Sequence, residues 1–434
     1  MKRRLIEWMH MKAEQGPFLL LNTKEIVSRL HEWFPDAARE LVVVTTRADI
    51  PSADIAAYAQ RFLHLEVVPD LWELPDAELL DLARRFGVRR ILSLGEREVL
   101  RAARMRAELG LPGQSLASAT AYRDKHVMKS TLAAAGIDVA PMRKFRSNDE
   151  LAEFTWKVGF PVVVKELDSG ASNGTVVLMD EEDLRALPER ATGTPRLAEA
   201  WVEGDFYHVN GLMKDGEVVL AVPSRNLYSD WFSVAYDAPT MTGMMPDEHP
   251  LSERLRSTAR QVVAALPAVP DLCAFHLELF HTADDRVVVC EIACRAGAAL
   301  VTDVHEAVLG MNFYGASLLG QAGRGDQVEI RPTGERLGFV WFPPAKGVLR
   351  ALPDTCPLPG TVSYRPCGDV GRLYGSSPGL GRPVAEMVFR LTEPDTGAEL
   401  RRIEEWWDDN VVWEHRTNAV PERWKTPRRK PADA

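Results

Sequence analysis

The feature that most constrains the fold is a regular alternation of short apolar runs and amphipathic segments near the start of the chain. Apolar runs lie at 17–22, 40–46, 64–69 and 89–95, and helix-like segments lie between them at 23–34, 52–62 and 76–87. Strands that alternate with helices of this length form βαβ units, whose strands lie parallel in one sheet. The sequence therefore predicts a parallel α/β domain in this region.

Bulk composition narrows the function classes. A chain of 434 residues exceeds one compact core, so we expect two to four subdomains. A net charge of −10 argues against sequence-independent nucleic-acid binding. Residues 1–16 do not read as a signal peptide, and no run approaches the ~18 apolar residues of a membrane span. Five cysteines without a CxxC pair disfavour a disulfide frame and a structural zinc site, so we expect a cytoplasmic protein.

Further along the chain, the pattern changes to longer helices and hairpins. A helix is expected at 119–136, with Thr120 as its N-cap and Gly136 as its stop, and another at 252–269. Asp215-Gly216 predicts a two-residue hairpin turn. After about residue 325, short strands broken by Pro and Gly are expected, followed by a last helix at 397–411.

A glycine- and serine-rich loop follows a strand that ends in a lysine, in GFPVVVKELDSGASNGTVVL. Gly170 and Gly174 allow backbone N–H groups to approach an anion, and Ser169 and Ser172 add hydroxyl donors. Lys165 supplies a positive charge, so the combination suits a polyphosphate. The alternative is an ordinary hairpin beside a lysine that extends to solvent.

An unusual hairpin is expected at 274–299, because each of its two apolar strands carries one acid. Strand alternation predicts that Glu278 shares a face with His276 and Phe280. The same rule places Glu291 on one face with Val289, Ala293 and Arg295. Two converging carboxylates repel and raise one pKa, which a cation such as Mg²⁺ relieves. An ordinary cross-strand contact between an arginine and an acid is the alternative.

Six segments in this order resemble the ATP-grasp superfamily, in particular the carboxylate–amine ligases that include the L-amino-acid ligases. The segments are YRDKHVMKSTLAAAGIDVAP, GFPVVVKELDSGASNGTVV, LAEAWVEGDFYHVNG, FHLELF and EIACRAG, preceded by ILSLGEREVLRAARMRAELGLPG, and FPPAKG follows them. The resemblance implies an α/β protein, α+β in its ATP-grasp part.

The resemblance implies a Rossmann-like pre-ATP-grasp domain at 1–118 and a two-lobed ATP-grasp domain at 119–325, with a flexible nucleotide lid at 143–205. It also implies a strand-rich C-terminal subdomain at 326–420 that completes the active site. A basic disordered tail is expected at 421–434.

The same resemblance implies roles for individual residues. Lys125 and Lys165 would hold nucleotide phosphates beneath the serine- and glycine-rich loop at 169–175, which resembles the family's lid loop over the phosphates. Glu199 would lie near the adenine amino group, with backbone contacts from Trp201 and Val202.

The acids and the arginine would act at the phosphate end. Glu278 and Glu291 would bind Mg²⁺, with Mn²⁺ as an alternative ion, and Glu278 would also contribute to the nucleotide site. Arg295 would stabilise the transferring phosphoryl group, and His276 would contact the substrate or an oxyanion.

Among the positions that depart from the family pattern, two bear on the predicted metal and ribose contacts. Ala293 replaces the asparagine that usually follows the second acid by two residues, which leaves the number of metal ions open. Phe206 replaces the usual ribose-binding glutamate, so Asp205, His208 or Asn210 are the candidates for that contact.

The resemblance implies an ATP-dependent ligase that converts a carboxylate to an acyl-phosphate and couples it to an amine. Small-molecule carboxylates and amines, such as amino acids or peptide-like metabolites, are the expected substrates, with no nucleic-acid or membrane partner and a homodimer as the expected assembly. One alternative is a carboxylase, or another acyl-phosphate ligase with a non-amine nucleophile. A second alternative, suggested by Ala293 and Phe206, is a catalytically impaired nucleotide-binding scaffold.

Overall fold

The computed structural model describes residues 17–50, 55–170, 172–188, 194–229, 237–375 and 382–414. Residues 1–16 and the predicted tail at 421–434 therefore lie outside the described residues. None of the described helices is both long and apolar enough to cross a bilayer.

The N-terminal unit is a four-stranded parallel sheet in the order β3-β2-β1-β4, as the alternation of strands and helices predicts. Its strands are β1 (Phe18–Leu21), β2 (Leu41–Thr46), β3 (His64–Val68) and β4 (Arg90–Ser93). Its helices are α2 (Leu30–Trp33), α3 (Ala37–Glu40), α4 (Ile55–Ala59), α5 (Asp76–Arg85) and α6 (Glu98–Leu109), with 3₁₀ turns η1 (Val27–Arg29) and η2 (Arg47–Asp49). The completely buried strand β1 lies at the centre, so the sheet has apolar layers on both faces.

Two predicted helices differ from those observed. The segment 23–34 is helical only from Val27, since Asn22 and Lys24 exchange side-chain and backbone hydrogen bonds that compete with an earlier helix start. The segment 119–136 is not one helix with Thr120 as its cap. Asp124 caps the second helix by accepting hydrogen bonds from the backbone of His126 and Val127.

The nucleotide-lid region predicted at 143–205 contains a separate antiparallel sheet in the order β5-β8-β6-β7. Its strands are β5 (Met142–Phe145), β6 (Val162–Glu166), β7 (Val176–Leu178) and β8 (Arg196–Ala200). The helices before and within this region are α7 (Leu116–Ala121), α8 (Lys125–Ala134), α9 (Asn148–Val158) and α10 (Glu181–Ala186).

The largest sheet has eight strands in the order β13-β12-β9-β10-β11-β14-β18-β16. Its strands are β9 (Asp205–Lys214), β10 (Glu217–Asn226), β11 (Thr240–Met244), β12 (Cys273–His281), β13 (Val287–Ala293), β14 (Leu337–Phe342), β16 (Thr361–Pro366) and β18 (Ala385–Arg390). The turn between β9 and β10 is formed by Asp215 and Gly216, both with positive φ, as predicted. Strands from the predicted C-terminal subdomain thus extend the sheet of the ATP-grasp part.

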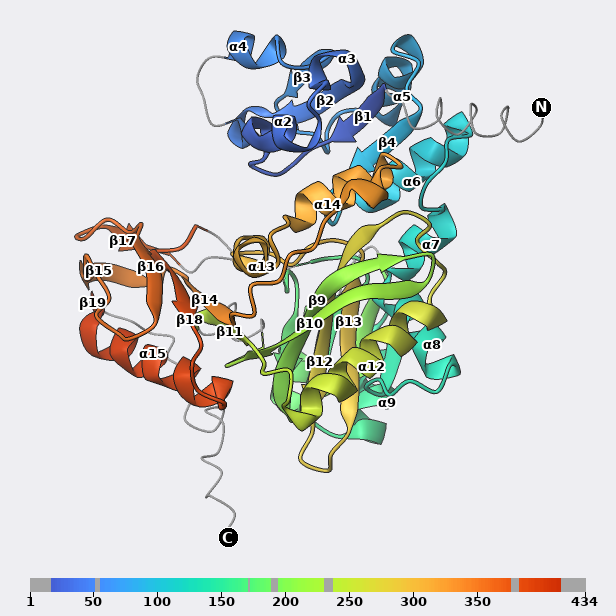
Figure 1. Ribbon diagram of the computed structural model, residues 1–434. Helices are drawn as coiled ribbons and strands as arrows, with labels where there is room; N and C mark the ends of the chain where they lie inside the picture. The colour runs from blue at the N-terminus through green and yellow to red at the C-terminus, as the bar shows by residue number, and fades with distance from the viewer. Residues whose placement is uncertain are drawn as a thin grey trace.

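The remaining elements pack around these sheets (Figure 1). They are α12 (Pro250–Ala265), α13 (Val301–Leu309), α14 (Phe313–Gln321), η3 (Gly325–Gln327) and α15 (Thr396–Asn410), with a small sheet of β17 (Leu373–Tyr374), β15 (Gly347–Ala351) and β19 (Val412–Glu414). In Figure 1, α14 lies between the N-terminal sheet and the rest of the molecule. Leu318 and Ala322 bury their side chains in the N-terminal core, so this helix joins the two parts.

Candidate functional site

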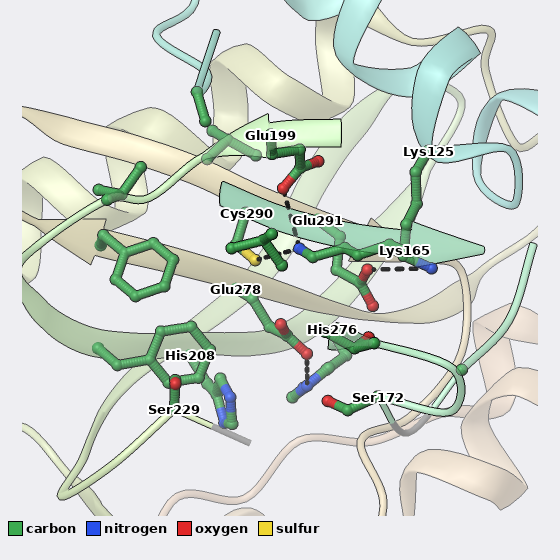
Figure 2. Close-up of a pocket in the computed structure, with 18 of the residues that line it drawn as sticks. Lys125, Lys165, Ser172, Glu199, His208, Ser229, His276, Glu278, Cys290 and Glu291 are labelled. Atoms are coloured by element: carbon green, nitrogen blue, oxygen red, sulfur yellow. Dashed lines mark hydrogen bonds and ion pairs between the residues drawn. The ribbon is translucent and has the colours of Figure 1, made fainter. Parts of the chain in front are cut away.

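The candidate site is a pocket between the lid sheet and the eight-stranded sheet (Figure 2). The predicted residues that line it are Lys125, Lys165, Ser169, Gly170, Ser172, Glu199, Trp201, Val202, His276, Glu278, Glu291 and Arg295. Gly174 does not line the pocket, but it has a φ of +71° in the lid loop, where a Cβ would lie 3.0 Å from Cγ of Glu166. The structure therefore gathers residues that are separated by up to 170 positions in the sequence.

Lys125 occupies the first position of α8, where the helix is tied to the end of β6. Its backbone N–H donates to Leu167 O at 2.9 Å, and its Nζ donates to Ser169 O at 2.6 Å. The same ammonium lies 3.3 Å from Oε2 of Glu291. Lys125 thus connects the base of the lid loop to the second acid.

Lys165 and Glu199 belong to a buried charge cluster that also contains Lys129. Glu199 lies 2.6 Å from Lys129 Nζ and 3.0 Å from Lys165 Nζ. Burial alone would raise the pKa of Glu199, but the two ammonium groups outweigh it and lower the pKa to about 2. The Glu199 carboxylate therefore orients two lysines, and its predicted contact with an adenine amino group stays a prediction.

Glu278 and Glu291 lie directly opposite each other on the paired strands β12 and β13, as the hairpin pattern predicts. Burial, followed by repulsion from Glu291, raises the pKa of Glu278 to about 8. Burial also acts against the charged form of Glu291, but Lys125 and then Lys165 hold the pKa of Glu291 below its ordinary value. Two ionised carboxylates are therefore disfavoured at this place unless a cation is bound.

Strict alternation fails immediately beside this pair. A β-bulge makes Glu278 pair with Glu291 but Leu279 pair with Val289, so Cys290 is an extra residue on β13. The prediction that Val289 shares the face of Glu291 is therefore wrong, since Val289 is completely buried in the core cluster that contains Leu279. Cys290 instead points into the pocket, with its Sγ 3.8 Å from Nζ of Lys165. Burial raises the pKa of Cys290 to about 12, so it is a neutral thiol.

Arg295 is held by an acid from the N-terminal unit. Glu96, in the turn between β4 and α6, contacts Arg295 with one carboxylate oxygen and Arg123 with the other. Arg123 also donates to the backbone carbonyl of Asp168 at the base of the lid loop. Burial would raise the pKa of Glu96, but Arg295 and Arg123 lower it to about 2. One carboxylate thus joins the N-terminal unit, the lid loop and the pocket arginine.

The predicted catalytic residue His276 lies beside the first acid. Its Nε2 is 3.5 Å from Oε1 of Glu278, and its Nδ1 is 2.8 Å from Oδ1 of Asn210. The ring of His208 packs edge-on against it, with a centroid separation of 4.5 Å. Gly297 borders the His276–Asn210 hydrogen bond so closely that a Cβ there would lie 2.9 Å from Nδ1 of His276.

The three ribose candidates are separated by the fold. His208 and Asn210 point toward His276 in the interior. Asp205 instead lines a second cavity, beside the segment that joins β8 to β9. Asp205 forms an ion pair with Arg225 at 3.2 Å. Phe206 packs against Phe280, with ring centroids 4.9 Å apart.

The segment at 201–204, called the hinge, joins β8 of the lid sheet to β9 of the eight-stranded sheet. The Trp201 N–H donates to Pro161 O at 3.2 Å, so a base would contact the Trp201 backbone through its carbonyl oxygen.

Four residues that line or support the pocket were either not predicted from the sequence or were predicted to do something else. Lys129 lies four residues after Lys125 on α8, a helical spacing that the sequence does contain. Cys290 turns into the site because of the bulge, for which the sequence gives no signal. Glu96 and His208 reach their partners through long-range packing, which no local pattern reports.

Paired lysines, an opposed acid pair and a serine- and glycine-rich loop gather in one pocket, as the resemblance to ATP-grasp proteins implies. The ATP-grasp domain family matches residues 130–299. The chain therefore contains an ATP-grasp domain, and the predicted place of the protein among ATP-grasp proteins is confirmed.

Curated relatives point in the same direction. The chain is 23% identical over 305 residues to an L-arginine-specific L-amino acid ligase of Bacillus subtilis, covering 66% of this chain and 71% of the relative. It is 30% identical over 122 residues to a D-alanine–D-alanine ligase of Methylococcus capsulatus, covering 28% of this chain and 39% of the relative.

Solved structures extend the similarity to almost the whole chain. The L-amino acid ligase of Bacillus licheniformis matches with a TM-score of 0.67 and 18% identity, covering 92% of this chain and 99% of that chain. A biotin carboxylase domain from Hydrogenobacter thermophilus, solved with MgADP and bicarbonate, matches with a TM-score of 0.63 and 15% identity, covering 92% of this chain and 91% of that chain. These likenesses show the fold, and the predicted α/β architecture is confirmed.

The acid pair fits a magnesium ion. Glu278 and Glu291 offer carboxylate oxygens, which Mg²⁺ prefers, at a place where the two negative charges oppose each other. A bound cation would remove the repulsion that raises the pKa of Glu278. The structure does not test a preference between Mg²⁺ and Mn²⁺.

Proposed function

We propose that this protein is an ATP-dependent ligase that activates a substrate carboxylate as an acyl-phosphate and joins it to an amine. The observation that carries the proposal is the direct opposition of Glu278 and Glu291 beneath Lys125 and Lys165. Acids and lysines arranged together can hold a polyphosphate and the cation that accompanies it. The ligase relatives support the same reaction class.

The proposed reaction has two steps. A substrate carboxylate oxygen attacks the γ-phosphorus of ATP, and the bond to the β-phosphate oxygen breaks to release ADP. The amine nitrogen then attacks the acyl carbon, phosphate leaves, and the nitrogen loses a proton to form the amide. Mg²⁺ held by Glu278 and Glu291 would supply charge neutralisation at the phosphates.

The residues of this chain have separate tasks in this scheme. Lys125 and Lys165 would bind phosphate oxygens, and Arg295 would stabilise the charge of the transferring group. The lid loop at 169–175 would cover the phosphates and exclude water, because an acyl-phosphate is open to hydrolysis. Amino acids or small peptide-like compounds are the proposed substrates, since the relatives are named as amino-acid ligases.

A release assay for ADP over pairs of amino acids tests this proposal. We expect ADP to form with particular pairs and an amide product to appear in equal amount by mass spectrometry. Nucleotide binding without ADP release across a broad panel would contradict the ligase and favour the impaired scaffold.

A carboxylase is the second candidate, because a biotin carboxylase domain matches with a TM-score of 0.63, close to the 0.67 of the amino acid ligase. Its nucleophile or acceptor would differ, so ADP release would depend on bicarbonate and would not require an amine. Measuring release with and without bicarbonate, at fixed amine, separates the two reactions.

A further inference from the structure

A group of three metal-ligating side chains lies beside the acid pair and is not explained by magnesium binding. His208, His276 and Glu278 each place one ligand atom within 4.8 Å of the corresponding atoms of the other two. Both histidines are almost completely buried, with exposed fractions of 4% and 6%. Figure 2 shows the two rings and the Glu278 carboxylate at the same end of the pocket.

The hydrogen bonds of His276 leave one nitrogen directed at the acid. Oδ1 of Asn210 can only accept, so Nδ1 of His276 donates to it across 2.8 Å. In the neutral ring, Nε2 then carries a lone pair and faces Oε1 of Glu278 at 3.5 Å. A lone pair facing an ionised carboxylate repels it, and the contact becomes favourable when a proton on either His276 or Glu278, or a metal ion, lies between them.

The surroundings of His208 distinguish between a proton and a metal ion at this place. Its Nδ1 is buried without a hydrogen-bond partner, and so is Oδ1 of Asn226, whose Nδ2 lies 3.4 Å from Nε2 of His208. Rotating the Asn226 amide by half a turn would let its oxygen accept from Nε2–H. Nδ1 of His208 would then hold a lone pair for a metal, whereas a proton on His276 or on Glu278 would leave that nitrogen unsatisfied.

We propose that His208, His276 and Glu278 bind a divalent transition-metal ion, at a site additional to the Mg²⁺ position between the two acids. Two imidazole nitrogens and one carboxylate oxygen suit ions such as Zn²⁺ or Co²⁺ better than Mg²⁺, which prefers oxygen ligands only. Metal bonds of about 2.0–2.2 Å bring neighbouring ligand atoms to roughly 3–4 Å, so the observed separations need only a small closure.

The surroundings resemble the supporting contacts of metal-binding histidines. Asn210 fixes the ring orientation of His276 through the nitrogen that is not directed at the acid, as second-layer carbonyl groups do. An ion there would keep Glu278 charged while Glu291 stays paired with Lys125.

Cobalt binding to the full-length protein tests this inference without any enzymatic reaction. After treatment with a chelator, the protein is titrated with Co²⁺ in the absence of nucleotide, and visible absorption and metal stoichiometry are measured. We expect one Co²⁺ per chain with an intense visible spectrum of nitrogen ligands. His208→Gln and His276→Gln should each weaken Co²⁺ binding about tenfold or more, while the exposed-site control His31→Gln should not.

The result that would overturn the inference is a cobalt affinity and spectrum unchanged in both variants, or no stoichiometric binding to the wild type. If the variants do not fold by circular dichroism, pulsed EPR of the wild type loaded with Cu²⁺, which favours imidazole ligands, decides. Nitrogen couplings from imidazole support the site, and oxygen ligands alone overturn it.

The ADP-release assay keeps this inference distinct from the proposed function. If the wild type binds no stoichiometric Co²⁺ but still releases ADP, only the metal site is overturned. Cobalt binding without ADP release for any substrate pair would support the metal site and contradict the ligase.

Discussion

The pocket that we propose binds ATP has a phosphate end and a hinge end, and the two ends are built in different ways. At the phosphate end, charged side chains fix one another: Lys125 contacts Glu291, Lys165 contacts Glu199, and Glu96 contacts Arg295. At the hinge end, the wall is largely apolar and includes Val202, Phe206 and Phe280. The lesson is that the phosphate end is preorganised by electrostatics before any ligand binds, whereas the hinge end is shaped by packing alone.

The largest expected effect comes from Glu291, the acid that lies opposite Glu278 and 3.3 Å from Nζ of Lys125. Glu291→Gln should reduce ADP release about 10²- to 10³-fold, because an amide cannot supply the negative charge that binds the cation. The fold should survive, since glutamine has nearly the same shape. Steady-state kinetics measure the effect, and Glu329→Gln, at an exposed ion pair with Arg331, is the matched control. Near-wild-type rates for Glu291→Gln would remove the acid from the site.

The second prediction concerns acid stability at the phosphate end. The folded-state pKa of Glu96 is about 2 against an ordinary 4.5, so its charged form stabilises the fold above pH 4.5, and this stability is lost as the pH falls toward 2. Glu96→Gln should lower the free energy of unfolding by about 3 kcal/mol at pH 7.

Denaturant unfolding at several pH values checks this prediction. The difference in the free energy of unfolding between Glu96→Gln and wild type should narrow as the pH falls from 4.5 toward 2, because Glu96 takes up a proton in the unfolded chain at a higher pH than in the folded protein. Glu108→Gln, at the exposed pair with Arg84, should show no such trend. A difference that does not change with pH would show that the carboxylate charge is unimportant.

The third prediction is a loss of nucleotide affinity. Lys165→Met removes a charge-assisted contact worth about 1.5–3 kcal/mol, so the dissociation constant of ADP should rise roughly 10- to 100-fold. Isothermal titration calorimetry with ADP and Mg²⁺ measures it. Lys346→Met, at a lysine outside the pocket lining, is the control. An unchanged affinity for Lys165→Met would show that the phosphates bind elsewhere.

The smallest effect is expected at the hinge end. Phe206→Leu keeps an apolar side chain in the wall, so it should cost less than about 1.5 kcal/mol of stability and change ADP affinity less than tenfold. Thermal unfolding and calorimetry provide the two readouts. A larger loss of ADP affinity than in Lys165→Met would reverse the comparison, because packing would then dominate binding.

The contrast between local side-chain patterns and long-range packing explains what could be predicted from the sequence. The βαβ pattern predicts the parallel N-terminal sheet, and the paired acids and the lysine-ended strand predict the phosphate end, because local periodicity decides which way these side chains point. Alternation could not predict the bulge that turns Cys290 into the pocket. Nor could it predict Glu96 beside Arg295, since that contact depends on how two units of the chain pack together.

The measurement that tests the central claim most directly is a crystal structure of the protein with ADP and Mg²⁺. The account predicts an ion about 2.0–2.1 Å from oxygens of Glu278 and Glu291, with the ammonium groups of Lys125 and Lys165 on the phosphates. Phosphates bound away from these four side chains, or an ion held by neither acid, would contradict it.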